Sequence, residues 1–331
     1  GHYLLTQNIT STETCININA DNVILDCQDY TITYSTSGIN NQHGVRVNGA
    51  YDNQTIRNCV IQDGNLTTDE INREGISFGT GASNVLLELN TVNTSDARAI
   101  DASTITNLIV RYNSIYANNS QALRFYEVEN GTCYNNTIHS KENVGLYLLN
   151  TNNSVFYNNT ISSTNNRGIE FGNAYYNNFS DTTVTAGSGA VVLYYPDNKF
   201  IRPNVSGAYG FYLRNANNSF IQDCRYVQGS INDVLIDASL QTVNVTFLNC
   251  SYDTESVSGA GNELTRQWYA DVYVYNATGD VDGVNVTVFD NTGAQYDSTL
   301  TDSNGRISRF VLTDYVATAS SITYYNNYTL H

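Results

Sequence analysis

The hydrophobic and polar positions of the chain repeat every 23 residues over the segment 84–161. Each unit opens on an asparagine, carries a second asparagine six residues later and has a β-branched aliphatic residue two positions after that. The four openings are Asn84, Asn107, Asn130 and Asn153. Short alternating segments, separated by Asn, Gly, Ser and Thr, indicate strands and no helix. A repeat of this length made only of strands predicts one coil of a parallel β-helix.

The repeat extends in both directions with looser spacing, from a first full coil at 20–27 to a last one near Ser256. We therefore expect an all-β protein whose residues 1–256 form a parallel β-helix of roughly ten coils. Because parallel crossovers are nearly always right-handed, the helix should be right-handed. The longer spacing before Asn84 predicts a polar loop over 63–73. One column is expected to form a buried ladder of hydrogen-bonded amides: Asn90, Asn113, Asn136 and Asn159.

A second, non-repeating unit follows the coils. Residues 257–265 are a short linker of small residues, and the repeat is absent from 266–331. Alternating strands begin at the only tryptophan, Trp268, and turn signals recur at short intervals. This pattern predicts a small antiparallel, immunoglobulin-like β-sandwich of about five strands. The unit is short for that fold, so a last strand is missing or comes from a neighbour.

Composition limits the classes of partner. The net charge is −16, with only 15 Lys and Arg, which disfavours nucleic acid and anionic lipid. No run of about 18 apolar residues is present, so no membrane span is expected. The chain begins almost inside its first coil, as a processed mature protein or a lone recombinant domain would. We expect an exported, extracellular protein of the cell surface.

Asn-X-Ser/Thr triplets, the acceptors of N-glycosylation, are dense. A chain rich in Asn, Ser and Thr also produces such triplets by chance. Asn135 and Asn158 each precede a ladder asparagine and should point outward. Covalent N-glycans are therefore expected partners. The candidate acceptors are Asn8, Asn53, Asn65, Asn93, Asn118, Asn130, Asn135, Asn152, Asn158, Asn178, Asn204, Asn217, Asn244, Asn249, Asn276, Asn285 and Asn327.

The six cysteines contain no Cys-X-X-Cys pair, which favours disulfides over metal in an exported chain. Cysteines in one column of adjacent coils fall within disulfide reach. The candidate pairs are Cys224–Cys250 and Cys27–Cys59, with Cys15–Cys27 as the rival at the N-terminal end. Free buried thiols are the alternative for all of them. Cys133 is expected to be such a thiol, because hydrophobic residues flank it in its column.

The outward column of one predicted sheet carries charged residues: Arg46, Ser77, Asp101, Arg124, Tyr147 and Glu170. Asp101 and Arg124 lie one coil apart and are expected to form a surface ion pair worth less than about 1 kcal/mol. Asp101 and Glu170 lie three coils apart, roughly 14 Å, which is too far for a glycosidase carboxylate pair. We therefore expect no catalytic residues and no enzymatic activity.

The sequence predicts no cofactor and no dedicated metal site. Its four histidines are not spaced as metal ligands. His43 precedes a glycine, which resembles a His-Gly element of polygalacturonases, but the paired aspartates of that family are absent. The acidic segments at 280–283 and around Asp302 could bind calcium weakly, and a plain turn is the alternative.

The run Cys15-Ile16-Asn17-Ile18, the segment 21–27 and the Asn-Asn-Thr-Ile coils resemble NosD-like right-handed parallel β-helix repeat proteins of archaeal cell-surface and S-layer glycoproteins. This resemblance covers about residues 3–256. The segments 283–288 and 301–305 resemble carboxypeptidase-regulatory-like or immunoglobulin-like modules. The resemblance implies export and a scaffold or adhesive role, and it transfers no catalytic residue.

These observations predict a structural, N-glycosylated surface protein, a subunit of a self-assembling extracellular layer, sheath or filament whose partners are copies of itself. The alternative is a carbohydrate-binding or polysaccharide-cleaving module that uses the outer face around Asp101, Arg124 and Glu170. A viral fibre or spike protein is a third possibility.

Overall fold

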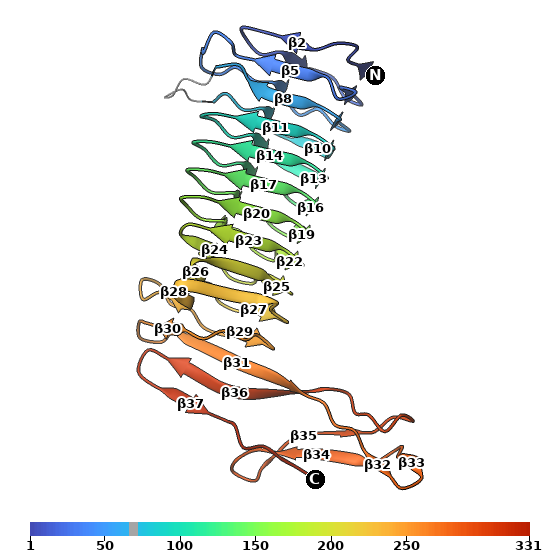
Figure 1. Ribbon diagram of the computed structural model, residues 1–331, viewed down its shortest axis with the longest axis vertical. Helices are drawn as coiled ribbons and strands as arrows, with labels where there is room; N and C mark the ends of the chain where they lie inside the picture. Colours follow the sequence, from blue (N-terminus) through green and yellow to red (C-terminus); the bar gives the residue numbers. More distant parts are fainter. Residues whose placement is uncertain (66–71) are drawn as a thin grey trace.

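The computed structural model describes residues 1–65 and 72–331, which contain strands and no helix. The strands wind into a right-handed parallel β-solenoid of about 11 turns, stacked from the N-terminal coil downward in Figure 1. Small antiparallel sheets follow at the C-terminal end. The predicted fold class is thus confirmed.

Each coil contributes strands to three faces, and each strand pairs in parallel with its counterpart in the next coil. The first face consists of β1 (His2–Leu4), β4 (Ile24–Asp26), β7 (Thr55–Arg57), β10 (Ala82–Glu88), β13 (Ile105–Arg111), β16 (Thr132–Tyr134), β19 (Val155–Tyr157), β22 (Asn178–Ser180), β25 (Lys199–Ile201), β27 (Phe220–Gln222), β29 (Val245–Leu248) and β31 (Glu263–Ala270). The second face consists of β2 (Ile9–Thr10), β5 (Thr31–Tyr34), β8 (Val60–Asp63), β11 (Thr91–Thr94), β14 (Ser114–Ala117), β17 (Thr137–Ser140), β20 (Thr160–Ser163) and β23 (Thr183–Ala186).

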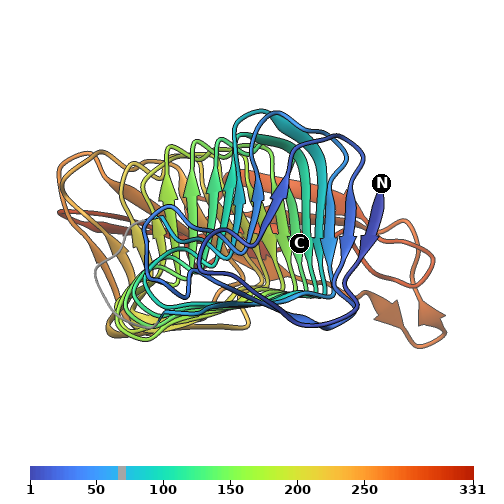
Figure 2. The same cartoon turned by 90° about the horizontal axis from the view of Figure 1, so that it is seen from above.

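The third face carries the charged column. It consists of β3 (Ile16–Ile18), β6 (Val45–Val47), β9 (Ile76–Phe78), β12 (Ile100–Ser103), β15 (Leu123–Tyr126), β18 (Leu146–Leu149), β21 (Ile169–Gly172), β24 (Gly189–Leu193) and β30 (Glu255–Val257). Two long strands, β26 (Asn204–Leu213) and β28 (Tyr226–Ile236), run over both the second and third faces. Seen from above, the coils lie over one another around a shared interior (Figure 2).

The asparagines that open the repeat lie at a corner where the backbone takes a positive φ. Asn84, Asn107, Asn130 and Asn153 have φ between 54° and 59°. Asparagine enters this left-handed region more readily than most residues, because its short polar side chain bonds locally. Asn107 Nδ2 also donates to Asn84 Oδ1 in the coil before it, at 3.1 Å. The period read from the sequence is therefore a backbone requirement reinforced by stacked amides.

The predicted inner ladder is present and buried. Asn113 Oδ1 accepts from the backbone N–H and the Nδ2 of Asn90 at 2.9 and 3.0 Å. Asn136 Oδ1 accepts the same two bonds from Asn113, and Asn159 Oδ1 accepts them from Asn136. Each amide also donates to a backbone carbonyl of the preceding coil, as Asn136 does to Val110 at 2.9 Å. The buried amides of this ladder are thereby hydrogen-bonded in each of its four coils.

Two disulfides join adjacent coils at opposite ends of the stack. They are Cys27–Cys59 and Cys224–Cys250, both weighed from the column alignment. Cys15 is unpaired and half-buried, so the rival pair Cys15–Cys27 does not form. Cys133 is a free, fully buried thiol between Val110 and Phe156, as expected.

The expected loop over 63–73 lies partly outside the described residues. Arg73, at its end, is fully buried, contrary to the prediction of a polar loop. Its Nη2 lies 3.3 Å from Asp63 Oδ2 and 3.5 Å from Asp96 Oδ2. Paired carboxylates make the burial of this charge tolerable.

The C-terminal unit continues from the last coil. Strand β31 pairs in parallel with β29 and antiparallel with β36 (Phe310–Thr318), which pairs with β37 (Ile322–Tyr324). The remaining strands are β32 (Tyr275–Asn276), β33 (Gly279–Asp280), β34 (Asn285–Phe289), β35 (Gln295–Leu300) and β38 (Thr329–Leu330). Small antiparallel sheets are therefore present, while the immunoglobulin-like sandwich stays a prediction.

The Asn136→Ala variant tests the inner ladder. It leaves the backbone N–H of Asn113 and the carbonyl of Val110 without their partners, so the free energy of unfolding should fall by roughly 2–5 kcal/mol. Chemical denaturation measures it. Ser114→Ala is the control, because that exposed hydroxyl bonds to none of the described residues. Equal stability of the two variants would contradict the role of the ladder.

Candidate functional site

Successive residues along the strands of the third face point alternately into the hydrophobic core and towards the outer surface. In β12, Ile100 and Ala102 are fully buried in the core, and Asp101 lies between them on the outer side. The register aligns the outward positions of successive coils. We define the polar strip as these outward residues: Asp101, Arg124, Tyr147, Glu170, Val192 and Tyr212.

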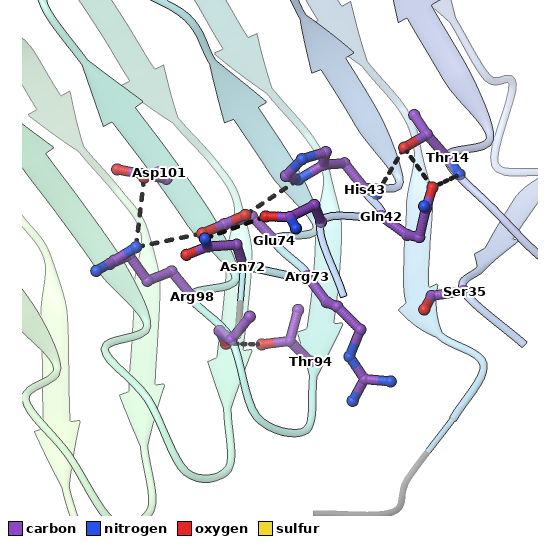
Figure 3. Close-up of polar contacts among 12 residues, drawn as sticks. Thr14, Ser35, Gln42, His43, Asn72, Arg73, Glu74, Thr94, Arg98 and Asp101 are labelled. Atoms are coloured by element: carbon purple, nitrogen blue, oxygen red, sulfur yellow. Dashed lines mark hydrogen bonds and ion pairs between the residues drawn. The ribbon is translucent and has the colours of Figure 1, made fainter. Parts of the chain in front are cut away.

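A chain of alternating charges occupies the N-terminal end of the polar strip (Figure 3). His43 Nδ1 lies 3.0 Å from Glu74 Oε2, and Arg98 Nη1 lies 3.2 Å from Glu74 Oε1. The same Arg98 nitrogen lies 3.5 Å from Asp101 Oδ2. Arg124 donates two hydrogen bonds of 2.7 Å to Asp101, from Nε to Oδ1 and from Nη2 to Oδ2. This bidentate geometry is the strongest for a guanidinium and a carboxylate.

The ion pair between Asp101 and Arg124 was predicted, but its setting is different from the surface pair expected. Asp101 is only 6% exposed, and its Oδ1 also accepts from Ser103 at 3.0 Å. Burial adds a desolvation cost to such a pair, and removing one partner alone leaves an uncompensated buried charge. Asp101 is therefore held rigidly in position.

Glu74 is the residue of this network that the sequence reasoning missed. It lies immediately before a strand of the third face, as do His43 and Arg98 in the neighbouring coils. Its carboxyl is almost fully buried. Burial acts to raise the pKa of Glu74, but His43 and Arg98 outweigh it and hold the pKa below its usual value. Its position before the strand, in the column of His43, was the available signal.

The spacing of the carboxylates defines what the network could do chemically. Because Glu74 and Asp101 contact the same Arg98 nitrogen, their nearest oxygens lie less than about 7 Å apart, with the guanidinium of Arg98 between them. Asp101 and Glu170 remain three coils apart, as predicted. The pair that the structure brings together is therefore Glu74 and Asp101.

Tyrosines and arginines occupy the other end of the polar strip. Burial raises the pKa of Tyr147, with Glu170 as a further cause. Arg167 Nη1 donates to Glu170 Oε1 at 2.6 Å. Beyond them a hollow of about 220 Å³ lies beside Tyr212. Half-buried tyrosines of this kind offer a flat apolar ring and a polar tip, as sugar-binding surfaces require.

All of the candidate glycosylation acceptors lie at the surface or are half-buried. The exposed ones are Asn8, Asn53, Asn93, Asn130, Asn158, Asn244, Asn276, Asn285 and Asn327. The half-buried ones are Asn65, Asn118, Asn135, Asn152, Asn178, Asn204, Asn217 and Asn249. Positions 66 and 67 of the Asn65 triplet lie outside the described residues. Modification at these asparagines stays a prediction.

Within 1–65 and 72–331, no cluster of three His, Cys, Asp or Glu has the arrangement of a metal site. Asp302 Oδ1 closes a turn by accepting from the backbone N–H groups of Asn304 and Arg306 at 2.9 Å. Weak calcium binding there, or at 280–283, stays a prediction. The part of the chain that the structure describes contains no helix long and apolar enough to cross a bilayer.

Comparison with known families matches residues 7–159 and 121–206 to the family described as the right-handed beta helix region. No curated protein sequence matches the chain. Among solved structures, the enzymatically active domain of tailspike protein 2 from bacteriophage CBA120 is similar, with a TM-score of 0.54 at 9% identity, over 94% of this chain and 65% of that one.

Two other solved structures are similar at lower scores. The A-module of the mannuronan C-5 epimerase AlgE4 from Azotobacter vinelandii has a TM-score of 0.45 at 15% identity, over 79% of each chain. A bacteriophage HK620 tailspike mutant in complex with a hexasaccharide has a TM-score of 0.35 at 11% identity, over 98% of this chain and 86% of that one.

The expectation of no enzymatic activity is corrected by these findings. A tailspike domain described as enzymatically active shares this fold, so the fold gives no reason to exclude an enzyme. The expectation rested on the absence of a carboxylate pair within one outward column. The structure forms such a pair between two neighbouring columns, from Glu74 and Asp101.

The Glu74→Gln variant tests the charge network. Because the folded-state pKa of Glu74 lies below its ordinary value of 4.5, its contribution is present above about pH 4.5 and is lost as the pH falls through the folded-state value. The variant should lower the free energy of unfolding by roughly 1–3 kcal/mol at pH 7. That difference should disappear in acid when unfolding is followed against pH.

Exposed Glu142 provides the control, as Glu142→Gln removes the same charge outside the network. A difference between Glu74→Gln and the native protein that stays constant down to acid pH would contradict the assignment.

Proposed function

The chain belongs to the right-handed β-helix family, and from that premise we propose that it is an extracellular protein that binds a polysaccharide and acts on it along the polar strip of the third face. The observation that carries this proposal is the continuity of the strip. Its outward side chains run in register from the Glu74–Asp101 pair to Tyr212 and the hollow beside it. An extended polymer matches such a linear site.

The two ends of the polar strip have different chemistry, which suggests a division of roles. The Glu74–Asp101 end holds carboxyl and guanidinium groups in fixed positions. Charged groups fixed in a low-dielectric site are suited to stabilising charge in a reacting sugar. The tyrosine end offers rings and hydroxyls that are suited to binding sugars. We assign the reacting position to the first end and chain binding to the second.

Two disulfides between coils support the extracellular location in this proposal, because such bonds persist in oxidising compartments. Archaeal origin, the narrower NosD-like resemblance and N-glycosylation remain predictions from the sequence. Self-assembly into a layer, sheath or filament also remains a prediction. The similarity to an enzymatically active tailspike domain favours the present proposal over that structural role.

The experiment is a combined binding and turnover assay of the purified chain against a panel of soluble extracellular polysaccharides. Binding is measured by calorimetry, and chain length and new chain ends by chromatography. Asp101→Asn should reduce turnover by at least about tenfold, whereas Tyr147→Ala should weaken binding by a similar factor, because a sugar loses its aromatic partner.

Ser114→Ala, on the second face, is the matched control and should leave both quantities unchanged. Unfolding midpoints of all variants show whether a loss reflects the site or the fold. Failure to bind any polysaccharide, or binding that neither strip variant changes, would overturn the proposal.

A further inference from the structure

The hollow at the C-terminal end of the polar strip lies between β24 and β26. It has a volume of about 220 Å³ and is lined by Arg167, Val192, Tyr194, Tyr209, Tyr212 and Arg214, among others. The strip leads into it directly, since Glu170 pairs with Val192 and Val192 with Tyr212 in the strand register. A hollow of this size accommodates one ring and its substituents, not a longer segment of polymer.

Arg214 differs from three of the other arginines of this face. Arg98, Arg124 and Arg167 each contact a carboxylate. Arg214 forms no ion pair with any described residue, and its Nε is buried with no described hydrogen-bond partner. A buried donor without an acceptor carries a desolvation penalty, and the same side chain lines the hollow.

The carboxylate that stands next to Arg214 is already engaged. Asp237 lies one coil beyond, because Leu213 pairs with Ile236 in the register. Asp237 Oδ1 accepts from the backbone N–H of Ser239 at 2.9 Å and also from the Ser239 hydroxyl. Burial and a hydrogen bond to Asp237 raise the pKa of Tyr212 to about 12, so Tyr212 stays a neutral donor to that carboxylate. The hydrogen bond from Ser239 and the charge of Arg214 are among the causes that lower the pKa of Asp237, but Arg214 and Asp237 form no close ion pair.

Aromatic rings form the walls around this guanidinium. The guanidinium carbons of Arg214 and Arg167 lie 5.6 and 5.7 Å from the centre of the Tyr194 ring. The Tyr212 ring lies edge-on to Tyr194, at 6.5 Å, and to Tyr209, at 5.7 Å. The site therefore combines a planar cation that has an unused donor with amphipathic rings that fit the faces of a sugar.

We propose that this hollow is a subsite for a sugar residue that bears a carboxylate, with Arg214 binding the carboxylate and the tyrosines contacting the ring. This assignment rests on the proposed function and adds to it a substrate class, an acidic polysaccharide. The guanidinium fork matches a carboxylate in shape and charge. Because the chain carries a net charge of −16, long-range attraction does not bring an anionic polymer to it, and a local cation is required.

The test compares polymannuronate and polygalacturonate with the same polymers after reduction of their carboxyl groups, and with a sulfated galactan. Binding is measured by calorimetry for the native chain, Arg214→Gln and Arg225→Gln. Arg225 is exposed and pairs with Asp181 elsewhere on the solenoid, so its replacement changes the net charge equally. We expect native binding of a carboxylated polymer, a loss of at least tenfold in Arg214→Gln, and no loss in Arg225→Gln.

Each other outcome has a distinct meaning. Equal binding of the carboxylated and reduced polymers, or binding that Arg214→Gln leaves intact, overturns the subsite and leaves the proposed function standing. Dependence on Arg214 for the sulfated polymer alone overturns the carboxylate assignment. Binding of no polymer overturns both proposals. If Arg214→Gln does not fold, Arg214→Lys keeps the charge without the planar fork and should still weaken carboxylate binding by several-fold.

Discussion

The spacing of the coils is the constraint on which the rest of the molecule depends. Strands of adjacent coils lie about 4.8 Å apart, so every side chain stands directly over its column neighbours. A residue type can recur along an inner column only if it is compatible with a copy of itself. Asparagine satisfies this condition because its amide both donates and accepts, as the ladder from Asn90 to Asn159 does. Phenylalanine satisfies it by stacking, as Phe156 and Phe179 do at 4.3 Å.

The same spacing has the opposite effect on the charged outer face, where a residue cannot be followed by a copy of itself. Like charges one coil apart repel, so a charged column is stable only where cations and anions alternate. The network from His43 through Glu74, Arg98 and Asp101 to Arg124 follows this order. Its consequence is that Glu74 and Asp101 are almost fully buried and each contacts a guanidinium group. The stacking of the coils thus places these charged groups together without a further structural element.

The sequence predicted the features that depend on the repeat of about 23 residues. The solenoid, the amide ladder, the Cys224–Cys250 bridge and the Asp101–Arg124 pair all join positions in one column of adjacent coils. Features that lie outside the alternating strands or join different columns were not predicted. Glu74 lies before its strand, in the column of His43 and Arg98, and Arg98 reaches Asp101 in the neighbouring column. The burial of Arg73 likewise depends on a coil of unusual length, which no period describes.

The separation between inner and outer columns also explains why two proteins with this fold need not share functional residues. The inner columns fix the coils, and the outer columns can change without disturbing them, so a tailspike domain can share this fold at 9% identity. Function must then be read from the outer groups that the fold itself does not use. A ligand that takes a partner from Arg124 must break a bidentate pair, whereas Arg214 has a donor that no described residue engages. Recognition of a ligand by the polar strip should therefore depend most on Arg214, whose hydrogen bonds the fold leaves incomplete.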